Sequence, residues 1–129
     1  MKHLPEIHFK AIPHKEQQYE TVGDYYKFGG MQFRVSKMNE DAEFLVLMHE
    51  LTEWYLTYKR GIKIKDIDKF DINFEKEREM GLHNDQEEPG NSKNAPYYAE
   101  HKFATMIERL IARELKVNWK EYDKMICAL

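Results

Sequence analysis

The chain has little cysteine and no long apolar run. Cys127 is the only cysteine among 129 residues, so no intrachain disulfide can form and a secreted disulfide scaffold is excluded. Residues 1–6 lack the apolar core of a signal peptide, and no later stretch approaches the roughly 20 apolar residues of a membrane span. From the sequence we expect a cytoplasmic protein in a reducing compartment, without a membrane partner.

A strong excess of one charge is also absent. Twenty Lys and Arg residues face 23 Asp and Glu residues, which gives a net charge of -3. Proteins that bind nucleic acid usually need an excess of basic residues to neutralise phosphates, so we do not expect nucleic acid as a partner. The hydrophobic content of 42% is sufficient for a packed core. The length predicts one domain over 1–129, with a β-rich part at 1–38 and a helical part at 39–129.

The β-rich part alternates apolar and polar residues with a period of two. The alternation appears at Ile7, Phe9 and Ala11, and again in the segments 25–28 and 31–35. Gly29 and Gly30 connect these two segments, and two glycines suit a hairpin because both accept positive φ. The sequence therefore predicts a small antiparallel sheet with a hairpin at 25–35.

The helical part begins with Asn39 and several acidic residues, which is a typical helix start, and Gly61 ends this first long helix. One apolar stripe, which we expect to face the core, contains Phe44, Leu47, Met48, Leu51, Trp54, Tyr55 and Tyr58. The opposite side carries His49 and Glu53 together with Leu45, Val46 and Leu56. A helix that is apolar on two sides is usually central to its domain.

Three further helices are expected. Asp66 suits the cap of a shorter helix, Pro96 the first turn of a second long helix, and Asn118 the start of a last short helix. The loop at 80–95 is long for a compact domain, which favours a functional segment. The fold class predicted is α+β, with the sheet packed against about four helices, two of them long. The expected core stripe of the second long helix contains Phe103, Ala104, Ile107, Leu110, Ile111 and Leu115.

One segment suggests chemistry. His49 and Glu53 are four residues apart on a helix, so their side chains project from the same side and can share one ion. An imidazole nitrogen with a carboxylate oxygen suits zinc or another first-row divalent ion, and catalytic zinc sites use three protein ligands with one open position. His101, on the second long helix, is the best candidate for the third ligand. The simpler alternative is a hydrogen bond between His49 and Glu53 without any ion.

Glu50 follows the first candidate ligand directly. Helical metallohydrolases carry their general base at this place, where it can take a proton from metal-bound water. Other acidic residues are reserve ligands, or partners that hold the histidine tautomers. This set consists of Asp71, Glu75, Glu100 and Glu108.

A series of spaced residues runs from the first long helix to the end of the chain: His49-Glu50-Leu51, Glu53, Glu88-Pro89-Gly90, Ala95-Pro96-Tyr97, Glu100-His101, Ala104, Ile107-Glu108, Trp119 and Tyr122. This series resembles a group of small bacteriophage and prophage proteins over about residues 45–125. The resemblance implies a phage-encoded accessory protein in the host cytoplasm, and it implies no activity.

Two enzyme families share parts of the first segment. His49-Glu50-x-x-Glu53 is similar to the His-Glu-x-x-His motif of zinc metallopeptidases, with Glu53 in place of the second histidine. Glu50-x-x-Glu53 also resembles half of the magnesium site of the all-α nucleotide pyrophosphohydrolases. The leading hypothesis is a metal-dependent hydrolase of zinc type that acts on a small molecule or peptide. The alternatives are a magnesium- or manganese-dependent pyrophosphohydrolase, and a non-enzymatic protein that binds a host protein.

Overall fold

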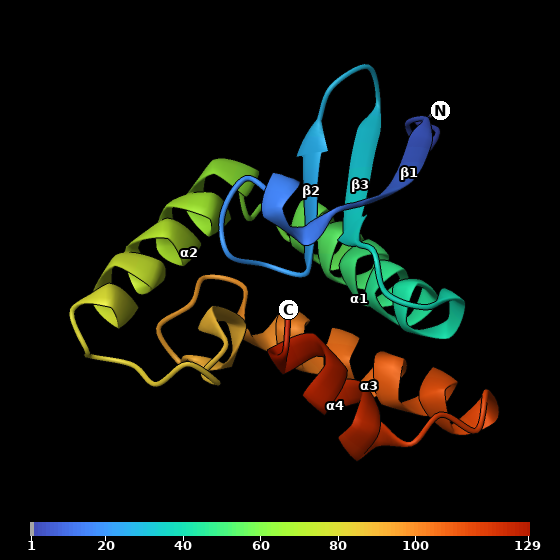
Figure 1. Cartoon of the computed structure of the whole chain (residues 1–129). Helices are drawn as coiled ribbons and strands as arrows, with labels where there is room; N and C mark the ends of the chain where they lie inside the picture. The colour runs from blue at the N-terminus through green and yellow to red at the C-terminus, as the bar shows by residue number, and fades with distance from the viewer. Residues whose placement is uncertain (1) are drawn as a thin grey trace.

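The computed structural model describes residues 2–129 and has an α+β architecture with three strands and four α-helices (Figure 1). The predicted fold class is therefore confirmed. Two short 3-10 helices lie at His14–Glu16 and Pro89–Asn91. The longer elements are β1 (Ile7–Ile12), β2 (Gly23–Lys27), β3 (Met31–Ser36), α1 (Glu40–Lys59), α2 (Ile64–Glu79), α3 (Tyr98–Glu114) and α4 (Trp119–Cys127).

The sheet is mixed, with the strand order β1-β3-β2. Strands β2 and β3 form the predicted antiparallel hairpin, and its two glycines, Gly29 and Gly30, have φ values of 56° and 99°. Strand β1 pairs with β3 in parallel, with Phe9 beside Phe33, so the expectation of a purely antiparallel sheet was wrong for β1. Side chains alternate between the two faces of a sheet in parallel and antiparallel strands alike, so the alternation could not reveal the direction of β1. The segment between β1 and β2 crosses from one edge of the sheet to the other.

Helix α1 lies between the sheet and α3 (Figure 1). Its start is as predicted, because the Asn39 side chain accepts a hydrogen bond from the Ala42 N–H at 2.9 Å. The predicted core stripe was right only in part: Trp54 is buried and Leu47 and Leu51 pack against the core. Phe44 and Tyr58 are 46% and 49% exposed, and most of the opposite side is buried. Both sides of this helix are apolar, so periodicity alone could not choose between them.

The stripe predicted for helix α3 was also right only in part. Phe103 and Leu110 are 42% and 49% exposed, whereas Ala104 is buried and Ile111 packs against the core. The rest of the buried side consists of Ala112 and polar side chains. Small residues allow two helices to approach closely, and this side of α3 packs along α1.

Helices α2, α3 and α4 begin close to where the sequence placed them. Helix α2 starts at Ile64 with Lys63 at its N-cap, so Asp66 lies in the first turn instead of capping it. Pro96 precedes α3 by two residues. Asn118 caps α4, because its side chain accepts a hydrogen bond from the Glu121 N–H at 3.0 Å. The start of α2 was therefore misplaced by three residues, the start of α3 by two, and the start of α4 was predicted correctly.

The apolar core has two parts. One lies between the sheet, α1 and α2, and its buried residues include Tyr25, Phe33 and Trp54. The other joins Val35 and the beginning of α1 to the end of α3 and to α4, with Leu45 at its centre. The middle of α1 therefore runs from one core to the other, and its buried side there is polar.

The two phenylalanines of the hairpin test this description. Phe33 is 1% exposed, so Phe33→Ala should lower the free energy of unfolding by about 3–5 kcal/mol through the cavity that it leaves. Phe28 is 74% exposed, and Phe28→Ala should change it by less than about 0.5 kcal/mol. Chemical denaturation followed by circular dichroism measures both, and equal losses would contradict the assigned hairpin register.

Candidate metal centre

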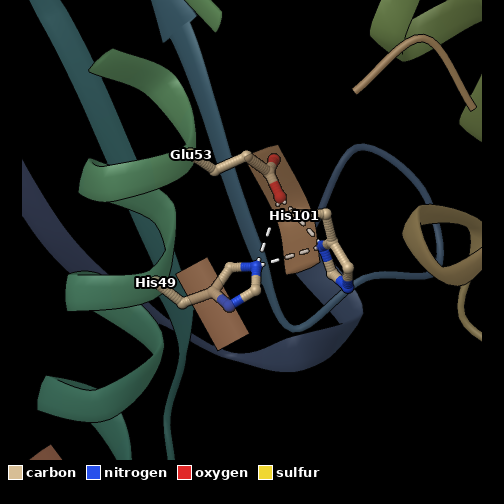
Figure 2. Close-up of side chains that lie close together, drawn as sticks. All are labelled: His49, Glu53 and His101. Carbon is tan, nitrogen blue, oxygen red and sulfur yellow. Dashed lines mark hydrogen bonds and ion pairs between the residues drawn. The ribbon is translucent and has the colours of Figure 1, made fainter. Parts of the chain in front are cut away.

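Three buried side chains meet between α1 and α3 (Figure 2). His49 Nε2 lies 3.2 Å from Glu53 Oε2 and 3.1 Å from His101 Nδ1. His101 Nδ1 lies 2.9 Å from the same Glu53 oxygen. His49 and Glu53 come from successive turns of α1, and His101 comes from the first turn of α3. The structure thus brings together the three residues that the sequence grouped as ligands.

The outward-facing nitrogen of each histidine has a carboxylate partner. His49 Nδ1 lies 2.8 Å from Glu108 Oε1, and His101 Nε2 lies 3.1 Å from Glu88 Oε2. A carboxylate accepts hydrogen bonds, so each of these nitrogens carries a hydrogen and donates it. In a neutral imidazole the other nitrogen then has a lone pair. The two lone pairs and the Glu53 oxygen consequently point at one another, and they require a proton or a metal ion between them.

The distances agree with metal coordination. Zinc binds histidine nitrogen at about 2.0–2.1 Å, and two ligands of a tetrahedral ion are then roughly 3.3 Å apart. The three distances observed here are 2.9, 3.1 and 3.2 Å. A small outward movement of each side chain would bring the three ligand atoms to the separation that they have around a tetrahedral zinc ion. The group therefore has the size and the donor atoms of a three-ligand site.

Further groups hold these residues in position. The Tyr25 hydroxyl donates to Glu53 Oε1 at 3.0 Å, and the Tyr122 hydroxyl donates to Glu108 Oε2 at 2.6 Å. Gly90 lies against the ring of His101, where a Cβ atom at Gly90 would come within 2.4 Å of that ring. Such partners fix the orientation and the tautomer of metal-binding histidines in known sites. Strand β2, helix α4 and the loop before α3 all contribute to this arrangement.

The charges are strongly coupled. Burial alone would lower the pKa of His101, but hydrogen bonds to Glu53 and Glu88 raise it to about 9. Burial alone would also lower the pKa of His49, yet its bonds to Glu108 and Glu53 raise it well above its usual value. For Glu53, burial alone would raise the pKa, whereas the bonds from both histidines lower it to about 2. The group thus holds positive charge tightly when no metal is bound.

Glu50 lies on the wall of a cavity of about 430 Å³ that reaches the three central residues. Burial, and then the charge of Glu53, raise the pKa of the Glu50 carboxyl well above its usual value. The β2 backbone passes directly over this side chain, because a Cβ atom at Gly23 would come within 2.8 Å of Glu50 Cγ. Glu50 is therefore a carboxyl with an elevated pKa beside the candidate metal position.

The same cavity has a second acidic wall. Burial, followed by the charge of Asp68, raises the pKa of Asp24 to about 6. Burial also raises the pKa of Asp71 to about 7, although Asp71 accepts hydrogen bonds from Tyr97 at 2.5 Å and Tyr19 at 3.2 Å. These carboxyl groups face the cavity from β2 and α2. They give this wall of the cavity a surplus of acidic groups.

The reserve residues have separate positions. Glu108 accepts a hydrogen bond from Nδ1 of His49 and thereby fixes the tautomer of that ring. Asp71 lies on the second wall of the cavity, and Glu75 forms an ion pair with Arg78 at 3.1 Å. Glu100 is buried and accepts a hydrogen bond from Arg60 at 2.8 Å, away from the histidines. Asp71, Glu75 and Glu100 are therefore not among the three converging residues, and the partner that buried Glu100 requires is Arg60.

Several residues around the centre carry no signal in the sequence that predicts their role. Glu88 lies in the acidic part of the long loop. The only feature of the sequence that singles it out is its place before Pro89 and Gly90 in the spaced series. Tyr122 also belongs to that series. Tyr25 was treated only as part of a strand and Asp24 was given no role, and no local pattern marks either of them as a neighbour of the centre.

Metal affinity should depend strongly on pH. Histidine must be neutral to bind a metal, and the pKa of His101 is about 9, so bound metal replaces a proton at neutral pH. The apparent affinity for zinc should therefore rise about tenfold per pH unit between pH 7 and 9 for each proton released. Titration at several pH values with a competing chelator measures this, and an affinity independent of pH would contradict the assigned ligands.

The metal-free protein should show the opposite trend. A pKa raised from 6.5 to about 9 by folding contributes stability that is complete below pH 6.5 and is lost as the pH rises through 9. The melting temperature of the chelated protein should therefore fall over this range. His101→Gln should flatten the slope.

The described chain, residues 2–129, contains no helix both long and apolar enough to cross a membrane. Comparisons of the sequence with protein-family models and with curated proteins, and of the fold with solved structures, gave no match. The functional argument therefore depends on the geometry of the centre.

Proposed function

We propose that this protein binds a divalent metal ion through His49, Glu53 and His101. One observation carries the proposal: three buried acceptor atoms converge within 3.2 Å of one another, while the hydrogen-bearing nitrogens of both imidazoles point to carboxylates on the outside. Without a metal ion or a bound proton the three lone pairs would face one another in a site shielded from water, which is costly.

Zinc suits this set of donors best. Two imidazole nitrogens and one carboxylate are a common ligand set of catalytic zinc sites, whereas magnesium prefers oxygen ligands and keeps several waters. Manganese is the second choice. The nucleotide pyrophosphohydrolase alternative needs a cluster of carboxylates around magnesium. Glu53 is instead held by two histidines, which favours the zinc type.

We further propose that the centre is hydrolytic. With three protein ligands, one coordination position remains for water, and a bound zinc ion lowers the pKa of such a water to about 7. The Glu50 carboxyl lies on the cavity wall beside the centre, and the charge of a bound cation would lower its raised pKa, so that the ionised carboxylate can accept the proton of this water. The cavity of about 430 Å³ is large enough for a small molecule or a short segment of peptide.

The biological setting follows from the resemblance to small phage and prophage proteins. We propose an accessory protein of that type that works in the host cytoplasm. Its substrate is a small molecule or a peptide. A purely non-enzymatic role with a host protein is the alternative, and the experiments on Glu50 below separate the two.

The metal site is tested by elemental analysis of protein purified without a histidine tag and without chelator. We expect about one zinc per chain, and a melting temperature that falls on chelation. His49→Ala and His101→Ala should each remove the metal and leave the helical content largely unchanged. His8→Ala, an exposed histidine of β1, is the matched control and should keep the metal. Wild-type protein that lacks metal and is not stabilised by added zinc or manganese would refute the proposal.

The catalytic role is tested with Glu50→Gln. This variant should keep its metal and its fold but lose about 10²- to 10⁴-fold in the hydrolysis rate of a peptide and nucleotide panel, because the general base is removed. Glu40→Gln, at an exposed position of the same helix, is the control and should retain full activity. Release of the metal by Glu50→Gln would make Glu50 a ligand. An unchanged rate would leave a structural ion.

A further inference from the structure

The acidic residues of the chain are concentrated around the cavity beside the metal centre. Twelve of the 23 Asp and Glu residues line this cavity, but only two of the 20 Lys and Arg residues do. These two are Arg78, which is paired with Glu75, and the exposed Lys124. The rest of the chain therefore has more basic than acidic side chains, although the net charge of the whole is -3. A recess lined by one sign of charge attracts ligands of the opposite sign.

Two buried carboxyl groups of this cavity have no counter charge. Five acidic residues are more than nine-tenths buried: Asp24, Glu53, Asp71, Glu100 and Glu108. The three glutamates pair with histidine or arginine. Within residues 2–129, no Lys, Arg or His nitrogen lies within 4.0 Å of the carboxyl oxygens of Asp24 or Asp71. A buried carboxylate without a cation is costly, so these two groups lack a positive partner.

The hydrogen bonds of these groups do not replace a cation. Asp71 accepts hydrogen bonds from the Tyr97 hydroxyl and from the Tyr19 hydroxyl at 3.2 Å, and the latter is also 3.5 Å from Asp68. A hydroxyl has one hydrogen, so Tyr19 can donate to only one of the two carboxyl groups at a time. Burial raises the pKa of Asp71 to about 7 and that of Asp24 to about 6, and a bound cation would lower both.

One basic side chain lies near these carboxyl groups without neutralising them. Arg34 is opposite Asp24 in the pairing of β2 with β3. Its guanidinium lies over the ring of Tyr26 instead, 4.9 Å from the ring centre. The acidic wall formed by Asp24, Asp68 and Asp71 therefore needs a cation from outside the described chain.

The spacing of the acidic wall suits an organic cation better than a second metal ion. Within residues 2–129, only His49, Glu53 and His101 bring three ligand atoms within 4.8 Å of one another. The N–H groups of an ammonium or a guanidinium bind carboxylate oxygens at about 2.7–2.9 Å, whereas zinc binds them at about 2.0–2.2 Å. A guanidinium also spreads five donors over a plane. Such a group can reach carboxyl groups that are too far apart to share a metal ion.

The acidic wall lies next to the metal centre. Tyr97, which donates to Asp71, packs edge-on against the ring of His101, with the ring centres 5.9 Å apart. Asp24 directly precedes Tyr25, whose hydroxyl donates to the carboxylate of the centre. One small molecule or peptide segment can therefore contact the metal centre and the acidic wall at the same time.

We propose that the substrate carries an ammonium or guanidinium group, which Asp24, Asp68 and Asp71 bind while the metal centre holds the bond to be cleaved. This proposal rests on the hydrolytic function proposed above and names its substrate class. The lysine or arginine side chain of a peptide and the amine of a small molecule offer the same chemistry. Anionic compounds such as nucleotides are disfavoured, because their phosphates would face carboxyl groups.

The binding of three short peptides tests the proposal. They are acetylated and amidated, and they carry lysine, glutamine or glutamate between two glycines. Calorimetric titration uses the metal-free wild type and zinc-loaded Glu50→Gln, because neither should cleave the peptides. We expect the lysine peptide to bind at least about tenfold more tightly than the glutamine peptide, and the glutamate peptide to bind most weakly.

A further ligand distinguishes the two sources of the amine. N-acetylcadaverine has the acylated amine and the ammonium group of acetylated lysine but no peptide chain. Affinity equal to that of the lysine peptide would assign a small amine as the substrate, and much weaker affinity would assign a peptide. Both results agree with recognition of the ammonium group.

Variants of helix α2 separate recognition by the acidic wall from general attraction to a negative chain. Asp71→Asn and Asp68→Asn should each reduce the preference for lysine over glutamine by about tenfold. Asp68 is less buried than Asp71, so its variant tests the wall even if thermal denaturation shows that Asp71→Asn is unstable. Asp66→Asn is the matched control, because it removes the same charge from an exposed position of α2 outside the cavity. It should leave the preference unchanged.

Equal affinities for the three peptides would overturn the proposal, and so would an equal loss of preference in Asp66→Asn. This failure differs from failure of the proposed function, because binding is measured without turnover. A protein that prefers the lysine peptide but cleaves nothing would show the cation site and refute the hydrolase. A hydrolase with the same KM for all three peptides would refute only the cation site.

Discussion

The need for a cation among three buried lone pairs is the constraint on which this structure depends. Helices α1 and α3 meet near the middle of α1 through buried polar side chains, where most small domains place aliphatic residues. Two histidines and a carboxylate can occupy that position only while something positive neutralises them. The contact between the two longest helices is consequently an electrostatic contact, and its strength is set by the ion or proton that it holds.

The remainder of the chain completes this contact. Helix α4 is short, yet its Tyr122 donates to Glu108, and Glu108 in turn fixes the ring of His49. Strand β2 supplies Tyr25 to the second oxygen of Glu53. Each residue at the centre is held by a partner from a different element, so the arrangement exists only when the whole domain is folded. A local peptide that contains the His49 segment would not reproduce it.

Local patterns explain what could be predicted and what could not. The pair His49 and Glu53 is visible in the sequence because four residues make one helical turn, and His101 was found from its place beside the apolar stripe of the next long helix. Glu88 and Tyr25 are 35 or fewer positions from Glu53 but lie on a loop and a strand, where no periodic rule relates them to a helix. The direction of β1 was missed because side-chain alternation is the same in parallel and antiparallel strands. Parts of the outer sides of α1 and α3 were taken for core because they are more apolar, whereas the histidines and carboxylates occupy the shielded sides.

The close approach of Gly90 to the ring of His101 has a consequence for the loop before α3. Connecting loops are ordinarily the best places to insert a tag, a reporter or extra residues. Here the Gly90 backbone packs against the imidazole ring of His101. The side chain of Glu88, two residues earlier, accepts a hydrogen bond from the same ring. The segment from 88 to 90 is thus constrained like the interior, although it lies in a loop. Where the chain can be lengthened is decided by a histidine on the following helix.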